Sequence, residues 1–380
     1  MGTLSQKVMS LFSSCAALGL LSCSSIAEVP QASSSAATPA SVFDLSKWNL
    51  TVPLDTDGNE SADVISTEAL MSYRHSNFFY INAEGHLVFA TPNKATTTPN
   101  STNTRSELRQ MIRGSDTSKN THSLENNFVL NSHPMSDRAP AIGGRLEATL
   151  KVDHVARRAQ IKTKKPTYSV VVGQIHAVKL ADHPVEYGWG NEPLKISFKK
   201  WPDHDYGSVY WAYERNLPKD DPNRTDIAYP VWGNTWDSEA APGQAGIKLG
   251  ETFSYTVDVS GNVMDLIFKT ERHGTTEYKI NLANNVDANG EPDTVDNPYG
   301  YSGDLMYFKA GAYNQCSSKQ QDGFWYPGCS GTGDWETDKA NGDYAQVTFE
   351  KLSVTGKTNI IDEYNSQTAD LNKPTLSIVR

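Results

Sequence analysis

Residues 253–269 read FSYTVDVSGNVMDLIFK, and this stretch decides the fold class. Apolar and polar side chains alternate through residues 253–259 and again through 263–269, which is the period of a strand with one buried face. Residues 260–262, Ser-Gly-Asn, stand between the two runs, and glycine and asparagine suit a tight turn. The stretch therefore predicts a β-hairpin.

The same alternation recurs on both sides of this hairpin. Four further segments show it: residues 145–152, 194–199, 276–282 and 344–354. Gly, Asn, Asp and Pro separate these short runs, and helical periodicity is limited to residues 66–71 and a few turns. This pattern predicts an all-β protein built as an antiparallel sandwich or barrel. Residues 214–250 are polar and rich in Pro, Gly and Asp, which predicts a long loop between strands.

Composition and charge narrow the class of protein. The 380-residue chain is 38% hydrophobic, which is enough for a packed core and excludes disorder throughout. Its formal net charge of −10 argues against non-specific binding to nucleic acid, because that binding needs a basic surface. No apolar run reaches the roughly 18 residues that a membrane-spanning helix requires. We therefore expect a folded protein, acting as a monomer, with no nucleic-acid partner.

Residues 1–22 are predicted to be a signal peptide. Lys7 is followed by a short apolar stretch, which is the pattern of a secretory leader. Two processing sites compete. Residues 20–23, LLSC, resemble a bacterial lipobox, which would make Cys23 the lipidated first residue of the mature protein. Cleavage after Ala27 would instead release a soluble secreted protein, and we favour the lipobox.

The remaining chain divides into three parts. Residues 23–41 are rich in Ser, Ala and Pro, which is typical of a flexible tether between a lipid anchor and a folded domain. Residues 42–356 contain the strand patterns and are predicted to form that domain, and residues 357–380 form a loosely packed tail. The protein is thus expected to be exported, either secreted or anchored by lipid at a bacterial outer membrane.

The cysteines support export. Of four, Cys15 and Cys23 precede the predicted domain, which leaves Cys316 and Cys329. In an oxidising compartment, a disulfide between these two is the favoured interpretation. A metal site is the weaker alternative, because no CxxC pair or HExxH motif occurs and the nine histidines are scattered.

Residues 105–111, RSELRQM, place charge on one face of a predicted strand. Arg105, Glu107 and Arg109 point to one side, whereas Leu108 points to the other. Taken alone, this pattern is typical of a surface ladder of salt bridges. The alternative is an anion-binding strip in which Glu107 orients the guanidinium groups, whose paired N–H donors match a carboxylate.

Residues 168–176, YSVVVGQIH, form an apolar strand with a polar end. Gln174 and His176 share a face, and Ile175 points the opposite way. A single histidine at such a place is more often structural. An amide and an imidazole side by side can, however, hold a substrate and move its proton.

Residues 307–315 read YFKAGAYNQ. Tyr307, Lys309 and Tyr313 lie on one face of a predicted strand, and Gly311 between the last two would leave room for a ligand. A lysine near a tyrosine favours the phenolate form. The competing interpretation is ordinary packing of a half-buried strand.

Together the blocks RSELR, QIH and YFKAGAYNQ resemble, in this order, the signature blocks of the alginate lyases of polysaccharide lyase family seven. Residues 43–53, FDLSKWNLTVP, and 342–349, GDYAQVTF, are similar to that family's first and last core strands. The resemblance spans roughly residues 43–355. It implies a jelly-roll β-sandwich of two antiparallel sheets, with a concave sheet that forms the substrate cleft. It implies no metal and no organic cofactor.

The resemblance also implies a reaction. Alginate is a 1,4-linked polymer of mannuronate and guluronate, and a lyase cleaves it by β-elimination. A base removes the C5 proton, which is α to the sugar carboxylate, and O4 of the next sugar departs with a proton. Neutralising that carboxylate lowers the barrier, and family positions assign this role to Arg105 and Gln174.

By the same resemblance His176 and Tyr313 move the protons, with Tyr313 as the donor to O4. In mannuronate the C5 proton and O4 lie on one side, so Tyr313 can act as base and acid; in guluronate they lie on opposite sides, which favours His176 as base. The remaining residues of the three blocks are predicted to bind substrate: Arg109, Glu107, Lys309, Gln315 and Tyr307.

Two rival functions remain. A jelly-roll glycoside hydrolase would need two carboxylates across the bond, and the three blocks supply only Glu107. A non-catalytic carbohydrate-binding module would need aromatic platforms without a His–Tyr pair. The preference for mannuronate or guluronate stays open, although Ile175 leans towards guluronate-containing blocks by resemblance. Endo versus exo cleavage stays open as well.

Overall fold

The computed structural model describes residues 37–159, 167–181, 185–316 and 328–356. The predicted signal peptide, Cys23, most of the predicted tether and the predicted tail lie outside these ranges. The described end of the tether is ordered, because Pro39–Ser41 form a short 3-10 helix, η1, in which Pro39 is buried. Within the described ranges, no helix has the length and apolar character needed to cross a membrane.

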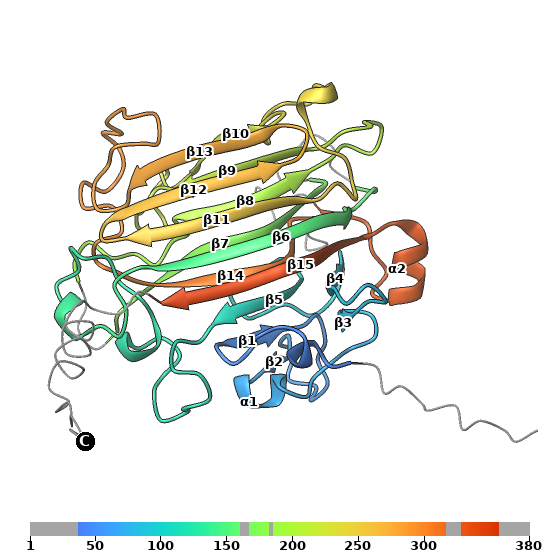
Figure 1. Ribbon diagram of the computed structural model, residues 1–380, viewed down its shortest axis with the longest axis horizontal. Helices are drawn as coiled ribbons and strands as arrows, with labels where there is room; N and C mark the ends of the chain where they lie inside the picture. Colours follow the sequence, from blue (N-terminus) through green and yellow to red (C-terminus); the bar gives the residue numbers. More distant parts are fainter. Residues whose placement is uncertain (1–36, 160–166, 182–184, 317–327, 357–380) are drawn as a thin grey trace, which may run out of the picture. The chain divides into compact units, whose positions relative to one another are not determined.

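Two antiparallel sheets form the body of the protein (Figure 1). The first has eight strands, in the spatial order β10 (Asp226–Trp232), β9 (Ser208–Glu214), β8 (Leu194–Lys199), β7 (Ser169–Lys179), β14 (Asp304–Asn314), β5 (Arg105–Gln110), β1 (Trp48–Thr51) and β2 (Val64–Ile65). The second has seven, in the order β13 (Gly274–Asn281), β12 (Val263–Thr270), β11 (Phe253–Ser260), β6 (Gly144–His154), β15 (Tyr344–Gly356), β4 (Leu87–Pro92) and β3 (Phe79–Ile81).

The sheets pack face to face around one apolar core, which makes the fold a jelly-roll β-sandwich. In β11, every second residue from Phe253 to Val259 is buried, as period-two alternation requires. Tyr255 also links the two sheets, because its hydroxyl donates to the carbonyl oxygen of Val172 at 3.0 Å. Strand β14 of the first sheet packs against β15 and β4 of the second. The predicted all-β sandwich is therefore confirmed.

The predicted hairpin is also confirmed. Strands β11 and β12 pair up to Ser260 opposite Val263, which leaves a two-residue turn of Gly261 and Asn262. Gly261 has φ +62°, a left-handed conformation that glycine adopts without steric cost. The other four predicted strands correspond to β6, β8, β13 and β15, with ends that differ by at most two residues.

Helices are few and short. The predicted helix appears as α1 (Thr67–Leu70), whose first turn is capped where Ser66 Oγ accepts from the backbone N–H of Ala69. A second helix, α2 (Trp335–Asn341), was not predicted; Asp334 caps its start. Besides η1, three short 3-10 helices are described: η2 (Leu124–Asn126), η3 (Ser136–Arg138) and η4 (Gly243–Ala245).

The prediction of one long loop over residues 214–250 is wrong. Strand β10 lies inside this segment and pairs with β9 as the edge of the eight-stranded sheet. The strand itself is mostly apolar, but it is short, it contains Pro230, and polar segments flank it on both sides, so it was not recognised in the sequence. The strand has a consequence for function, since it brings Asp226 into register with Glu214 on β9.

Candidate active site

The three sequence blocks become neighbours in the eight-stranded sheet, where β14 lies between β5 and β7. Lys309 on β14 is in register with Arg109 on β5 and with Gln174 on β7. Two residues earlier on β14, on the same face of the strand, Tyr307 is opposite His176. At the other end, Tyr313 is opposite Arg105.

These side chains share the outer face of the sheet, because the residues that alternate with them fill the core. Leu108, Ile175 and Phe308 are fully buried between the two sheets. Ile175 therefore does not reach the outer face, so any influence it has on the preference for guluronate cannot act through direct contact with a sugar there.

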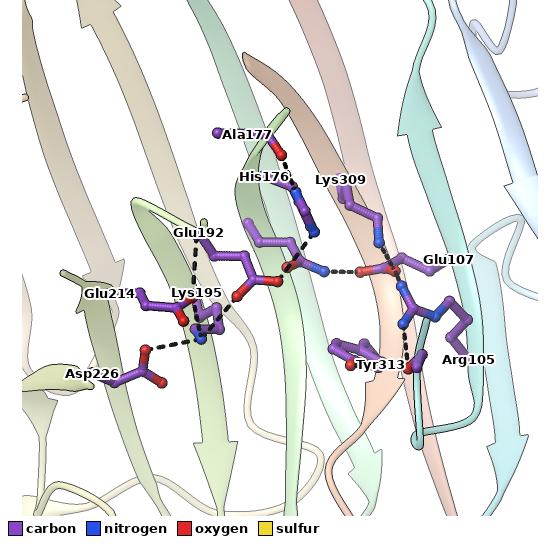
Figure 2. Close-up of polar contacts among 12 residues, drawn as sticks. Arg105, Glu107, His176, Ala177, Glu192, Lys195, Glu214, Asp226, Lys309 and Tyr313 are labelled. Atoms are coloured by element: carbon purple, nitrogen blue, oxygen red, sulfur yellow. Dashed lines mark hydrogen bonds and ion pairs between the residues drawn. The ribbon is translucent and has the colours of Figure 1, made fainter. Parts of the chain in front are cut away.

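Glu107 is the centre of a charged cluster, drawn in Figure 2. Its carboxylate is only 2% exposed, and Lys309 Nζ lies 2.5 Å from its Oε2 atom. Arg105 Nη1 donates to the same oxygen at 3.1 Å. Gln174 Nε2 donates to the other oxygen, Oε1. Two cations around one carboxylate leave a local excess of one positive charge, which favours binding of an anion.

The electrostatics of this cluster follow from burial and proximity. Burial alone would raise the pKa of the Glu107 carboxyl, but the charges of Lys309 and Arg105 hold that pKa below its ordinary value. Burial, together with the positive charge of Arg105, lowers the pKa of Lys309 to about 8. Glu107 therefore stays ionised at neutral pH, whereas Lys309 loses its proton at a mildly alkaline pH.

Two polar atoms in this cluster have no hydrogen-bond partner within the described ranges. They are Gln174 Oε1, an acceptor, and Arg105 Nε, a donor. Buried polar atoms are nearly always paired in folded proteins, so such atoms beside a charged cluster indicate where a ligand binds.

Tyr313 is held by Arg105 and Ser101. The guanidinium carbon of Arg105 lies 4.0 Å from the centre of the Tyr313 ring, a cation–π contact. The Tyr313 hydroxyl lies 3.3 Å from Ser101 Oγ, which accepts a hydrogen bond from Arg105 Nη2 at 2.9 Å. Ser101 was not predicted from the sequence, because it lies in a loop just before the first block.

Gly311 has a packing role that was not predicted from the sequence, and the room it leaves for a ligand stays a prediction. It has φ +145°, and a Cβ atom there would lie 2.5 Å from Ser106 O and 2.8 Å from the Cα of Glu107. The β14–β7 ladder also shifts register between Ala310 and Tyr313. The glycine is therefore needed for the close approach of β5, and it lies within this irregularity, two residues before Tyr313.

His176 has an acceptor at each ring nitrogen. Its Nδ1 lies 2.6 Å from the carbonyl oxygen of Ala177, and its Nε2 lies 3.1 Å from Glu192 Oε1 (Figure 2). The ring stacks on Tyr307, with centroids 5.4 Å apart and planes 8° from parallel. His176 is about one third exposed, so it remains accessible from the outer face.

Arg109 and Gln315 were predicted to bind substrate, but both side chains are buried and already have hydrogen-bond partners in the protein. The Arg109 guanidinium lies 3.9 Å from the Tyr307 ring centre and donates to Thr121 O at 2.8 Å and to Asn127 Oδ1 at 2.9 Å. It thereby ties the loop after β5 to the sheet. Gln315 follows β14, is 7% exposed and donates weakly to Tyr313 O at 3.4 Å.

A second charged cluster lies next to His176 and was not predicted from the sequence. Lys195 Nζ lies 3.2 Å from Glu192 Oε2, 3.6 Å from Glu214 Oε2 and 3.0 Å from Asp226 Oδ1. We call these four residues the Lys195 cluster. The sequence feature that could have indicated this cluster is Lys195, a charged residue on the polar face of the predicted strand 194–199.

The carboxylates of the Lys195 cluster differ in acidity. Burial would raise the pKa of Glu192, but Lys195 and its other neighbours hold that pKa well below the ordinary value. Burial and the neighbouring Glu192 charge raise the pKa of Glu214, even though Lys195 opposes this. Glu192 is therefore the ionised member that faces His176.

Two of the basic residues that precede the second block, Lys151 and Arg158, lie away from the cluster around Glu107. Lys151 lies on β6 of the other sheet, where it contacts Glu84 at 3.7 Å. Arg158 is paired with Asp343. The lysines at 162, 164 and 165 lie outside the described ranges.

Cys316 and Cys329 lie next to each other, with Cα atoms 5.4 Å apart, as predicted for a disulfide pair. Both are buried in a small apolar cluster with Ala156, Ala159 and Tyr168. The aromatic residues at 324–326 lie outside the described ranges.

Within the described ranges, one group of acidic side chains has the spacing of a metal site: Asp55, Asp57 and Asp63. These residues lie outside the three blocks, and all three accept hydrogen bonds from backbone N–H groups nearby. Among the residues that the structure describes, Glu107 is the one carboxylate in contact with both Arg105 and Lys309.

Comparison with known proteins agrees with this arrangement. Residues 43–356 match the family model described as alginate lyase. An alginate lyase from Klebsiella pneumoniae is 35% identical over 353 residues, which cover 90% of this chain and 96% of the relative. The crystal structure of the alginate lyase from Klebsiella pneumoniae has a TM-score of 0.65 and 34% identity, covering 84% of this chain and 99% of that one. The crystal structure of the exolytic alginate lyase AlyA5 from Zobellia galactanivorans has a TM-score of 0.66 and 31% identity. The match covers 84% of this chain and 98% of that one.

Fold and site together define a jelly-roll protein with a cluster of arginine, lysine, tyrosine and histidine side chains on the outer face of its larger sheet. The chain belongs to the alginate lyase family, as its three sequence blocks predicted.

Proposed function

We propose that this protein is an alginate lyase, which cleaves 1,4-linked chains of mannuronate and guluronate by β-elimination and leaves 4,5-unsaturated oligouronates. The observation that carries the proposal is that the four predicted catalytic residues share the outer face of the eight-stranded sheet. They come from three adjacent strands, β5, β14 and β7. Membership of the family supports the same reaction.

Arg105 is assigned to the sugar carboxylate. Its guanidinium adds to the positive charge of Lys309, and its Nε donor has no partner within the described ranges. Neutralising the carboxylate makes the adjacent C5 proton more acidic, because the negative charge that develops on loss of the proton is then stabilised. Gln174 contributes beside it, with its carbonyl oxygen open to a hydroxyl or a protonated carboxyl group of the substrate.

Proton transfer is assigned to Tyr313 and His176. The C5–H bond breaks as a base takes the proton, a double bond forms between C4 and C5, and the C4–O4 bond breaks as O4 accepts a proton from Tyr313. Tyr313 can perform both transfers on mannuronate, and His176 is the candidate base for guluronate. Lys309, Glu107 and Tyr307 hold these groups in place, and Arg109 and Gln315 remain predicted contacts to the substrate.

The product distinguishes this proposal from its rivals. A lyase creates a double bond conjugated to the carboxylate, which absorbs in the near ultraviolet, whereas a hydrolase or a binding module creates none. Glu192 and Glu214 are two carboxyl groups near the site, but their side chains hydrogen-bond each other and both contact Lys195, so they do not flank a space for a glycosidic bond as a hydrolase requires. Reducing ends that form without a rise in absorbance would overturn the proposal in favour of hydrolysis. Polymannuronate and polyguluronate of defined length, used in parallel, would give the substrate preference and the mode of cleavage.

We also propose that the protein is exported by its first 22 residues, works as a monomer, and is anchored through a lipid on Cys23. An oxidising compartment would form the Cys316–Cys329 disulfide, and the adjacent positions of these cysteines support that. Metabolic labelling with a fatty acid should tag the wild type but not Cys23→Ala. An unlabelled mature protein that begins at Glu28 would instead establish the soluble secreted form.

A further inference from the structure

Asp304, the first residue of β14, is a fully buried carboxylate that the proposed mechanism does not use. Its Oδ1 accepts the backbone N–H of Gly190 at 2.8 Å, and its Oδ2 accepts Asn216 Nδ2 at 2.7 Å. The backbone N–H of Trp189 also donates to this carboxylate. Burying a carboxylate is costly unless donors compensate it, and here the donors come from two other parts of the chain. Asp304 therefore joins three segments that are far apart in the sequence.

Asn216 extends this connection. It follows β9, is fully buried, and donates from the same Nδ2 to Gly300 O at 2.7 Å. Its Oδ1 accepts a hydrogen bond from Asn191 Nδ2 at 3.3 Å, and that amide also donates to Leu217 O at 2.8 Å. Asp304, Asn216 and Asn191 thus form one buried series of hydrogen bonds, which we call the Asp304 network. A buried network whose members are paired fixes one arrangement of the segments it joins.

The Asp304 network holds the segment that borders His176. Asn191 O accepts the backbone N–H of Ala177 at 2.8 Å, which fastens residues 189–192 to β7 one residue after His176. The next residue, Glu192, places its Oε1 atom 3.1 Å from His176 Nε2 (Figure 2). The position of the Glu192 side chain beside the imidazole therefore depends on how firmly this segment is held.

We propose that Asp304 is a positioning residue, whose carboxylate holds residues 189–192 against β7 and thereby fixes Glu192 beside His176. For its effect on cleavage the inference rests on the proposed function. Both oxygens of Asp304 face N–H donors, so only a group that accepts at both positions fits there. A neutral carboxyl or an amide would set a donor against a donor. Neutralising Asp304 should therefore loosen the segment.

The first test measures the segment itself and needs no substrate. Asp304→Asn keeps the size of the side chain, but its amide turns a donor towards either Gly190 or Asn216. We expect hydrogen exchange at the backbone amides of Gly190 and Ala177 to become at least about tenfold faster than in wild type, because a buried group is left unpaired. Amides of β11, in the opposite sheet, should exchange as in wild type.

Asp338→Asn is the matched control. Asp338 is also fully buried and accepts two backbone N–H groups, at 2.6 and 3.0 Å, but it lies on α2, which contacts β4 of the other sheet. Both variants should lower Tm, whereas only Asp304→Asn should accelerate exchange at Gly190 and Ala177. Equal exchange in the two variants would overturn the proposal, and so would exchange in Asp304→Asn that matches wild type.

The second test varies the pH of the wild-type protein, so it does not depend on the folding of Asp304→Asn. Burial raises the pKa of the Asp304 carboxyl to about 7, and the positive charge of Lys179 on β7 opposes this rise. Two further titratable groups precede β14 in the chain. Burial raises the pKa of Tyr301 well above its ordinary value, so this phenol stays neutral. Asp296, whose pKa burial also raises, accepts the backbone N–H of Asn216.

Lowering the pH through about 7 should therefore convert the Asp304 carboxylate into a carboxyl group. Exchange at Gly190, corrected for the intrinsic effect of pH, should become faster over this range relative to the amides of β11. Asp296→Asn should keep this effect, because it leaves Asp304 in place. Corrected exchange that does not change with pH would contradict the proposal, and so would loss of the effect in Asp296→Asn.

Kinetics connect the segment to cleavage. With alginate as substrate, Asp304→Asn should lower kcat at least about tenfold and change KM less, because small displacements beside a reacting group are costly whereas the cationic cluster around Glu107 still meets the substrate. Asp338→Asn should keep the kcat of wild type at a temperature where both variants are folded. Faster exchange without a fall in kcat would show that Asp304 does not position the site. A wild-type protein that forms no unsaturated product refutes the proposed function instead, and hydrogen exchange would still decide whether Asp304 holds the segment.

Discussion

Glu107 sets the orientation of the Gln174 side chain. Gln174 Nε2 donates to Glu107 Oε1, which turns the amide carbonyl oxygen, Oε1, away from the carboxylate. Reversing the amide would place its oxygen against an ionised carboxylate, which is repulsive. The orientation matters because it leaves an acceptor, not a donor, without a partner within the described ranges. Gln174 is therefore suited to a substrate hydroxyl or a protonated carboxyl group, and Arg105 to the carboxylate anion.

The first prediction concerns Glu107→Gln. This change leaves Lys309 and Arg105 without a counter-charge in a nearly buried place, so it should destabilise the fold by up to about 3–5 kcal/mol. It should also lower kcat/KM, because a neutral amide no longer fixes the Gln174 orientation. Chemical denaturation and the ultraviolet assay measure the two effects. The double variant Glu107→Gln, Lys309→Met should regain much of the stability without regaining activity; recovery of both would show that Glu107 only balances charge.

The second prediction concerns Tyr313→Phe. The variant loses the proton donor but keeps the ring under Arg105, so turnover should fall at least about a hundredfold. The hydroxyl has one contact at 3.3 Å, with Ser101, so stability should change by no more than about 1 kcal/mol. Ser101→Ala is the control, since it removes that contact and keeps the phenol. Near-normal turnover in Tyr313→Phe would remove Tyr313 from the mechanism.

The third prediction concerns Arg105→Lys. Lysine keeps the positive charge but cannot contact Glu107 and Ser101 with separate nitrogens while lying flat over the Tyr313 ring. We expect kcat/KM to fall at least about tenfold with the fold intact by circular dichroism. If lysine supports full activity, positive charge alone is sufficient and the account of carboxylate binding is wrong.

The fourth prediction concerns pH and Lys309, whose pKa in the folded protein is lowered to about 8. As the pH rises through about 8, the site loses a positive charge, so KM for the anionic polymer should rise more than kcat falls. Lys309→Gln should have a high KM that no longer changes over this range. Lys279→Gln, an exposed lysine on β13, should behave like wild type.

The same lowered pKa has a consequence for stability. The unfolded chain holds the Lys309 proton up to a pH of about 10.5, whereas the folded protein releases it near pH 8. Because the unfolded state then binds more protons, this lysine should make the free energy of unfolding increase with pH between these two values. Denaturation of wild type and Lys309→Gln across this range measures that contribution. Parallel curves for the two proteins would contradict the assignment.

The fifth prediction concerns the cysteine pair. A disulfide between Cys316 and Cys329 closes a loop of about 14 residues, which is worth about 3 kcal/mol in the chain-entropy model. The double Cys→Ser variant should have a lower Tm. It should also have a lower turnover, because Cys316 lies three residues after Tyr313 and small displacements of a catalytic group are costly. Two reactive thiols in the denatured, unreduced mature protein would show that no bond forms.

Much of the fold could be predicted because strands with one buried face carry their period in the sequence. The alternation through residues 253–269 depends only on which side chains point inward, and the hairpin needs only a local turn. Strand β10 escaped prediction because it is a short edge strand that contains Pro230 and lies between polar, Pro- and Asp-rich segments. Helix α2 was missed for lack of an apolar period, although Asp334 and Gly342 bound it as a cap and a left-handed stop.

The sequence by itself determined which residue types could do the chemistry and on which face of each strand they lie. Arg105, Gln174, His176 and Tyr313 could be named because their blocks resemble those of a known family, and the period of a strand then placed them on the same faces. Only the tertiary structure decided what each of them touches. The pairing of Glu192 with His176, the orientation of the Gln174 amide and the place of Gly311 against β5 join segments that are far apart in the chain. Such contacts depend on strand order, register and bulges, which the whole packed sheet decides and no local pattern records.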